Sequence, residues 1–104
     1  TWNPAMATAW GRAMGEEFAG KGSNVQLGPG LCIERVPWNG RNFEYTSGED
    51  PFLGSLLAGA AVQGIQSQHV VATAKHWVVN SQETNRTTDV SIVDERTRFE
   101  IYYP

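Results

Sequence analysis

The sequence lacks an excess of positive charge. Eight Lys and Arg residues stand against eleven Asp and Glu residues, and the formal net charge is −3. A protein that binds a nucleic-acid backbone needs basic side chains to neutralise the phosphates. The charge balance therefore excludes a basic nucleic-acid binder, and we expect no nucleic-acid partner.

Cysteine and long apolar runs are also scarce. Cys32 is the only cysteine among 104 residues, which excludes a disulfide scaffold. The longest stretch with little charge, residues 51–74, is interrupted by glycines and by a polar Gln-Ser-Gln-His segment. It does not reach the ~20 consecutive apolar residues of a membrane-spanning helix. We therefore expect no membrane partner, and the composition suits one small globular unit.

Sequence motifs for metals and cofactors are missing too. His69 and His76 lie on opposite sides of a predicted strand, so they are not expected to share a metal ion. The sequence contains no glycine-rich phosphate loop and no serine-centred nucleophile elbow. The sequence thus predicts neither a metal site nor a cofactor.

What the sequence does contain is an alternation of helical and extended segments. Asn3-Pro4 and Asp50-Pro51 are each typical of a helix start, and Asp94 is expected to cap a third helix. Residues 24–29 and 70–74 are predicted strands, the second of them buried on both faces. This order predicts an α/β fold with a parallel sheet. The apolar stripe of the first helix is expected to pack in the core; it consists of Met6, Trp10, Met14 and Phe18.

Polar side chains follow both predicted strands, at the edge where α/β folds carry their functional sites. Lys75-His76 ends the second strand, and Arg41 and Arg86 lie in the two long loops. From spacing alone, Lys75-His76 is better explained as a solvated strand end, because no spacing rule favours catalysis there. Arg41 with Glu44 is equally well a surface ion pair of little consequence. The aromatic residues of these loops, Trp38, Phe43 and Trp77, are expected to pack rather than to stack on a ligand.

Taken in order, these segments resemble glycoside hydrolase family 3, and most closely its β-glucosidases. The resemblance covers nearly the whole chain, and it is the ordered set rather than any one motif that is specific. The segments that carry it are Gly11-Arg12-Ala13-Met14-Gly15-Glu16-Glu17-Phe18, Asn24-Val25-Gln26-Leu27-Gly28-Pro29, Gly40-Arg41-Asn42-Phe43-Glu44, Glu49-Asp50-Pro51, and Ala74-Lys75-His76 with Asn80, Gln82-Glu83 and Arg86.

The resemblance implies that residues 1–104 are an internal part of the family's N-terminal (β/α)₈ barrel (TIM-barrel) domain. In the family an α/β sandwich domain follows this barrel. A (β/α)₈ barrel takes roughly 250 residues, so the chain would hold well under half of one. The start without Met and the end at Tyr103-Pro104 are then expected to be cut points.

The resemblance also implies a substrate site that binds the non-reducing glucose of a β-glucoside or oligosaccharide. Arg, Lys and His side chains would donate hydrogen bonds to the sugar hydroxyls. The implied binding residues are Arg41, Lys75, His76 and Arg86, and the implied supporting residues are Glu44, Asn80 and Glu83.

A retaining β-glucosidase that works without a cofactor is the activity that the resemblance implies. Its aspartate nucleophile and separate acid/base are expected outside this stretch, because none of the eleven carboxylates matches either position. The isolated chain is therefore expected to be inactive, and family membership suggests a secreted enzyme. Two alternatives stay open: a non-catalytic carbohydrate-binding or structural module, and a family 3 β-xylosidase.

Overall fold

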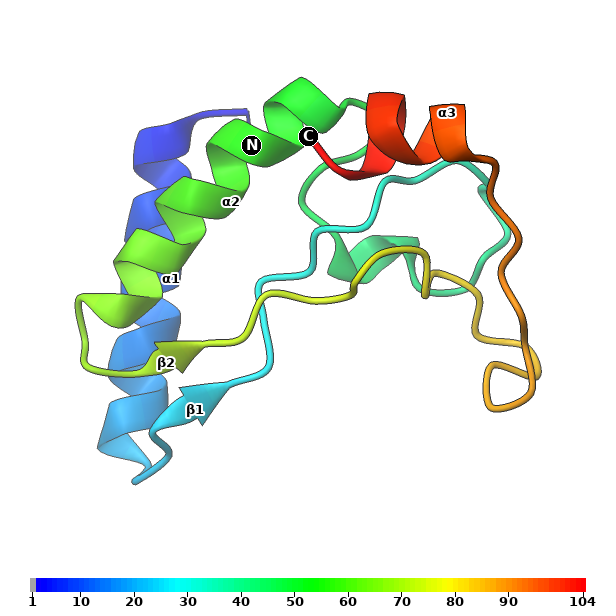
Figure 1. Ribbon diagram of the computed structural model, residues 1–104. Coiled ribbons are helices and arrows are strands. Elements are labelled where there is room, and N and C mark those ends of the chain that lie inside the picture. The colour runs from blue at the N-terminus through cyan, green and yellow to red at the C-terminus, as the bar shows by residue number, and fades with distance from the viewer. Residues whose placement is uncertain (1) are drawn as a thin grey trace.

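The computed structural model describes residues 2–104, in which two long helices and a small parallel sheet are joined by long loops (Figure 1). The alternation of helix and strand agrees with the predicted α/β order, while the third helix is short. The elements are α1 (Pro4–Gly20), β1 (Val25–Gln26), a 3₁₀ turn (Asn42–Glu44), α2 (Pro51–Gln66), β2 (Val71–Ala72), α3 (Glu95–Thr97) and a π-helical turn (Arg98–Tyr102).

The three predicted helix starts are confirmed by their capping hydrogen bonds. The Asn3 side chain accepts a hydrogen bond from the Ala5 amide at 2.9 Å, and the Asp50 side chain accepts one from the Phe52 amide at 3.0 Å. Each of these helices has proline in its first turn, where the missing N–H costs nothing. At α3, Asp94 accepts from the Thr97 hydroxyl at 2.7 Å and from the Thr97 amide at 3.0 Å, and these bonds lower the pKa of its carboxyl.

Helices α1 and α2 pack against each other through small residues (Figure 1). The buried residues of α1 are Ala7, Gly11 and Gly15. A Cβ atom at Gly11 would collide with the carbonyl oxygen of Ala61, and one at Gly64 with the carbonyl oxygen of Thr8. Glycine is therefore what allows the two helix backbones to touch.

The prediction that the Met and aromatic stripe of α1 packs in the core holds only in part, since Met14 and Phe18 are half-buried. Met6 and Trp10 are exposed, because the glycine stripe one position along the helix takes the place against α2. Both stripes recur every four residues, so helical periodicity alone does not distinguish them. The buried side of α2 consists instead of residues on its predicted apolar face, including Leu57, Ala61 and Ile65.

Strands β1 and β2 are parallel, as predicted, with Val25 opposite Val71 and Gln26 opposite Ala72. The prediction of a strand buried on both faces holds only for Val70, since Val71 is 55% exposed. Neither face of this two-residue pair is fully covered within residues 2–104. In the same range no helix combines the length and apolar character needed to cross a bilayer.

Candidate functional site

Three backbone segments meet at Gly30, just after β1. Gly30 forms parallel bridges with Tyr45 on one side and with Lys75 on the other. The Leu31 amide donates to the Lys75 carbonyl at 2.6 Å, and the Thr46 amide donates to the Gly30 carbonyl at 3.1 Å. A Cβ atom at Gly30 would lie 2.7 Å from the Tyr45 ring, so only glycine fits here. This junction places the loop before Tyr45 beside Lys75-His76.

Glu44 lies at the centre of a charged cluster that these segments bring together. Arg41 binds its carboxylate in a bidentate manner, with Nε 2.9 Å from Oε1 and Nη2 3.2 Å from Oε2. Lys75 Nζ donates to Oε2 at 2.8 Å. The bonds from Arg41 and Lys75 lower the pKa of Glu44 to about 2, and the bond to Glu44 raises the pKa of Arg41. Glu44 and Arg41 are therefore both charged at neutral pH.

A second carboxylate, Glu83, borders the cluster from the later loop. The Glu83 amide donates to the Asn39 carbonyl at 2.8 Å, which holds this loop against the first one. Its Oε2 lies 3.3 Å from Arg86 Nε and 3.6 Å from Arg41 Nε. Glu83 and Arg86 are about half exposed, so their ion pair contributes little to stability. It sets the position of the Arg86 guanidinium.

His76 has a different neighbour at each ring nitrogen. Its Nδ1 lies 3.1 Å from the Tyr45 hydroxyl, which in turn donates to the Asn80 carbonyl at 2.8 Å. Its Nε2 lies 3.5 Å from Arg41 Nη2. Burial, followed by the positive charges of Arg41 and Lys75, lowers the pKa of the imidazole, which is therefore neutral at neutral pH.

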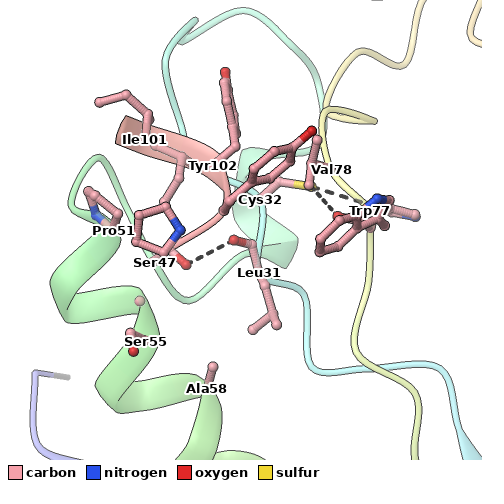
Figure 2. A pocket seen from close by; sticks show the side chains of 15 residues that line it. Leu31, Cys32, Ser47, Pro51, Ser55, Ala58, Trp77, Val78, Ile101 and Tyr102 are labelled. Carbon is pink, nitrogen blue, oxygen red and sulfur yellow. Dashed lines mark hydrogen bonds between the residues drawn. The ribbon is translucent and has the colours of Figure 1, made fainter. Parts of the chain in front are cut away.

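His76 also lines an apolar pocket of about 290 Å³, which Figure 2 shows from close by. Cys32, Ser55 and Tyr102 are among its lining residues. The Cys32 sulfur lies 4.0 Å from His76 Nδ1 and 3.8 Å from the His76 carbonyl oxygen. His76 thus contacts the charged cluster and also lines the apolar pocket.

Most of the residues predicted from the sequence come together in the charged cluster. Arg41, Glu44, Lys75 and His76 contact one another, and Glu83 and Arg86 border them. Asn80 takes part through its backbone carbonyl, while its side chain is not among the contacts of the cluster.

The predicted packing of two loop aromatics is wrong within this chain, since Trp38 and Phe43 are exposed. Trp77 stacks on Tyr103, with ring centroids 5.4 Å apart.

Tyr45 and Gly30 are the functional neighbours that sequence reasoning missed. Tyr45 directly follows the Gly-Arg-Asn-Phe-Glu run, and this adjacency was the only available signal. The role of Gly30 depends on a close approach of distant segments, which no local pattern reveals.

The cluster is suited to binding a ligand rich in oxygen. Arg41 is 8% exposed, and its Nη1 is buried without a partner among the described residues. Arginine and lysine offer donors only, so each suits a hydroxyl or anionic oxygen. Glu44 cannot serve as a general acid near neutral pH, because its pKa is about 2. In residues 2–104 no group of three His, Cys, Asp or Glu side chains is placed to hold a metal ion.

Comparison with known proteins identifies close relatives. The family model described as "Glycosyl hydrolase family 3 N terminal domain" matches residues 1–101. The chain is 48% identical over 103 residues to thermostable beta-glucosidase B of Acetivibrio thermocellus, and 48% identical over 105 residues to beta-glucosidase BoGH3A of Bacteroides ovatus. It spans only 14% of the length of each.

Solved structures of β-glucosidases also match this chain. The structure of beta-glucosidase 3B from Thermotoga neapolitana in complex with glucose matches with a TM-score of 0.91 at 50% identity, over 97% of this chain and 14% of that chain. The beta-glucosidase of Bifidobacterium adolescentis matches with a TM-score of 0.91 at 43% identity, over 99% of this chain and 15% of that one.

Proposed function

Because the chain belongs to the family of the glycosyl hydrolase family 3 N-terminal domain, we propose that it is part of a β-glucosidase and supplies residues that bind the terminal glucose. The observation that carries this proposal is the donor cluster, in which Arg41 and Lys75 are both held by Glu44 and lie beside His76. Relatives named as β-glucosidases, one of them solved with glucose, support the choice of sugar.

We propose that residues 1–104 form an internal part of a (β/α)₈ barrel. The parallel pairing of β1 with β2 and the helices that precede each strand support this arrangement. The exposed apolar side chains of Phe52, Leu56 and Val71 offer surfaces against which further barrel segments would pack. The rest of the barrel and a following α/β sandwich domain would then be the partners of this stretch in the intact enzyme.

The chemistry proposed for this stretch is binding. The donors of Arg41, Lys75 and Arg86 would hold the ring hydroxyls, and donors that tighten in the transition state accelerate glycosyl transfer. Since Glu44 and Glu83 are both engaged with arginine, neither is free to act as nucleophile or acid/base. A retaining enzyme would bring that pair of carboxylates from outside this stretch, by double displacement and without a cofactor.

Replacing Lys75 or His76 in the parent enzyme tests the proposal. We expect Lys75→Ala and His76→Ala each to lower kcat/KM for an aryl β-glucoside by at least ~10²-fold, which corresponds to about 2.7 kcal/mol of lost transition-state binding. Lys21→Ala is the matched control, because Lys21 pairs with Glu17 at the exposed end of α1. Near-wild-type kcat/KM in both site variants would contradict the sugar-binding role.

A non-catalytic carbohydrate-binding module is the second candidate, because the donors held by Glu44 could bind a sugar whether or not the parent protein carries the catalytic carboxylates. The parent protein separates the two. Glucose binding that depends on Lys75 without any turnover would identify the module, whereas turnover would identify the enzyme. Comparing kcat/KM for aryl β-glucoside and aryl β-xyloside distinguishes a β-glucosidase from a family 3 β-xylosidase.

A further inference from the structure

We propose that Tyr45 is a positioning residue that holds His76 in the tautomer with its proton on Nδ1, so that Nε2 accepts a hydrogen bond from a sugar hydroxyl. The tautomer follows from the contacts around the ring, and the sugar contact rests on the proposed function. This differs from the donating role expected for His76 from the sequence.

The Tyr45 side of the ring fixes the proton on Nδ1. A tyrosine hydroxyl has one proton to donate, and in Tyr45 that proton goes to the Asn80 carbonyl at 2.8 Å. The same hydroxyl lies 3.1 Å from His76 Nδ1, so toward the imidazole it can only accept. A neutral imidazole that donates from Nδ1 has a lone pair on Nε2. Because Tyr45 is only 8% exposed, water does not readily replace this partner.

The Arg41 side of the ring requires the same tautomer independently. Arg41 Nη2 lies 3.5 Å from Nε2, and a guanidinium nitrogen can donate but never accept. A proton on Nε2 would set two N–H groups against each other. An unprotonated Nε2 is therefore favoured, which again leaves the proton on Nδ1. At 3.5 Å the Arg41 contact is long for a hydrogen bond, so the Nε2 lone pair remains able to accept from a closer sugar hydroxyl.

The remaining neighbours keep the ring neutral. Cys32 donates its thiol proton to the His76 carbonyl at 3.8 Å, which leaves its sulfur as a weak acceptor 4.0 Å from Nδ1. The charged groups that face the ring are Arg41, Lys75 and Arg86, opposed by Glu44. Together with burial, this net positive surrounding lowers the pKa of His76 and disfavours a second proton.

As a consequence, the site side chains differ in whether they need a hydrogen-bond donor or an acceptor on the sugar. Arg41 and Lys75 are satisfied by any oxygen that accepts, whereas His76 Nε2 needs a group that donates. A hydroxyl meets this demand. A fluorine in its place is a weak acceptor and has no proton, so it should be no better than hydrogen at this position. His76 is thus a specificity-determining residue, and Tyr45 makes it one.

The test measures competitive inhibition of the parent enzyme by glucose and by its deoxy and deoxyfluoro analogues. Inhibition constants report binding without the effect of fluorine on the reacting centre. Replacing the hydroxyl that contacts His76 by hydrogen should weaken binding to the unmodified enzyme but not to His76→Ala. This difference identifies which hydroxyl faces His76. At that position we expect the deoxy and deoxyfluoro sugars to bind equally weakly, about tenfold weaker than glucose, the value of one lost hydrogen bond.

Tyr45→Phe tests the positioning role. We expect this variant to bind glucose about fivefold more weakly, with little change for the sugar that lacks the His76-facing hydroxyl. Tyr103→Phe is the matched control, because its ring stacks on Trp77 and lies outside these contacts. Equal weakening of every ligand by Tyr45→Phe would show a merely structural role and overturn the positioning proposal.

Once the hydroxyl that faces His76 is known, the deoxy and deoxyfluoro sugars can be compared in the unmodified enzyme. This comparison does not depend on the folding of any variant. A deoxyfluoro sugar that binds as tightly as glucose at the His76 position would show that Nε2 donates, which overturns the tautomer and leaves the glucose site intact. If no hydroxyl responds to His76→Ala, His76 does not contact the sugar, and the roles proposed for both His76 and Tyr45 are refuted.

Discussion

Neutralising Glu44 tests whether the donor cluster is held in place by its carboxylate. In Glu44→Gln the side chain keeps its shape, but one oxygen becomes an NH₂ group. Two of the three donors, Arg41 Nη2 and Lys75 Nζ, face Oε2, and the third, Arg41 Nε, faces Oε1. The amide therefore keeps its oxygen at the Oε2 position, and its nitrogen then meets Arg41 Nε donor to donor.

The free-energy cost of Glu44→Gln follows from the hydrogen bonds that the carboxylate loses. One charge-assisted hydrogen bond is replaced by a repulsive contact, and the other two now have an uncharged acceptor. A hydrogen bond to an ionised group stabilises a protein by ~1.5–3 kcal/mol. The Glu44 side chain is 22% exposed, and solvent screening brings the expected cost to about 2 kcal/mol. If that energy holds the donors in their binding geometry, kcat/KM for an aryl β-glucoside falls about 30-fold.

The acid side of the stability profile gives a second readout. An ordinary glutamate has a pKa of about 4.3. The pKa of Glu44 is lowered to about 2, so its stabilising contribution is complete above about pH 4.3 and is lost as the pH falls through about 2. The Tm difference between the unmodified enzyme and Glu44→Gln should therefore be constant above about pH 5 and narrow below pH 4.

The assays are steady-state kinetics and thermal unfolding of the parent enzyme. Glu49→Gln is the control, since Glu49 is exposed and lies outside the cluster. We expect it to leave kcat/KM unchanged. A Glu44→Gln enzyme with unaltered kcat/KM and an unaltered Tm at pH 7 would refute the view that Glu44 positions Arg41 and Lys75.

Two further predictions concern the helix pair and the isolated chain. Gly64→Ala should lower the Tm of the parent enzyme more than Gly59→Ala does. A Cβ atom at Gly64 would collide with the Thr8 carbonyl oxygen, whereas one at Gly59 meets nothing within 4 Å among the described residues. Equal Tm values for the two variants would contradict the packing described. The isolated 104-residue chain should show no turnover of an aryl β-glucoside, because its site carboxylates are engaged with arginine. Measurable hydrolysis by the pure chain would overturn the assignment of nucleophile and acid/base to other segments.

Local chemistry made the helix starts predictable. An Asn-Pro or Asp-Pro pair combines a capping side chain with a proline that fits the first turn, and the structure has both at the expected places. The buried face of α1 was not predictable in the same way. Met6 and Trp10 are apolar enough to suggest a core, yet the contact with α2 depends on Gly11 and Gly15, whose value is the space they leave.

The charged residues of the site were identified by their order along the chain, which is the property that a family resemblance preserves. The state of His76 was not identified, because it depends on where one proton of Tyr45 goes. That proton goes to the backbone carbonyl of Asn80, in a loop that sequence alone does not place. Side-chain identity is therefore enough to name candidates, while donor and acceptor roles require the three-dimensional contacts.

The backbone junction at Gly30 has a consequence for engineering. Because Gly30 bridges both Tyr45 and Lys75 through main-chain pairing, the spacing between Glu44 and Lys75 is independent of the side chains in the intervening loops. Substitutions at the exposed residues 35–38 would therefore change the surroundings of the site while the donors keep their separation. Such loops are a natural place to alter what lies beyond the bound sugar, and Gly30 is the position to leave untouched.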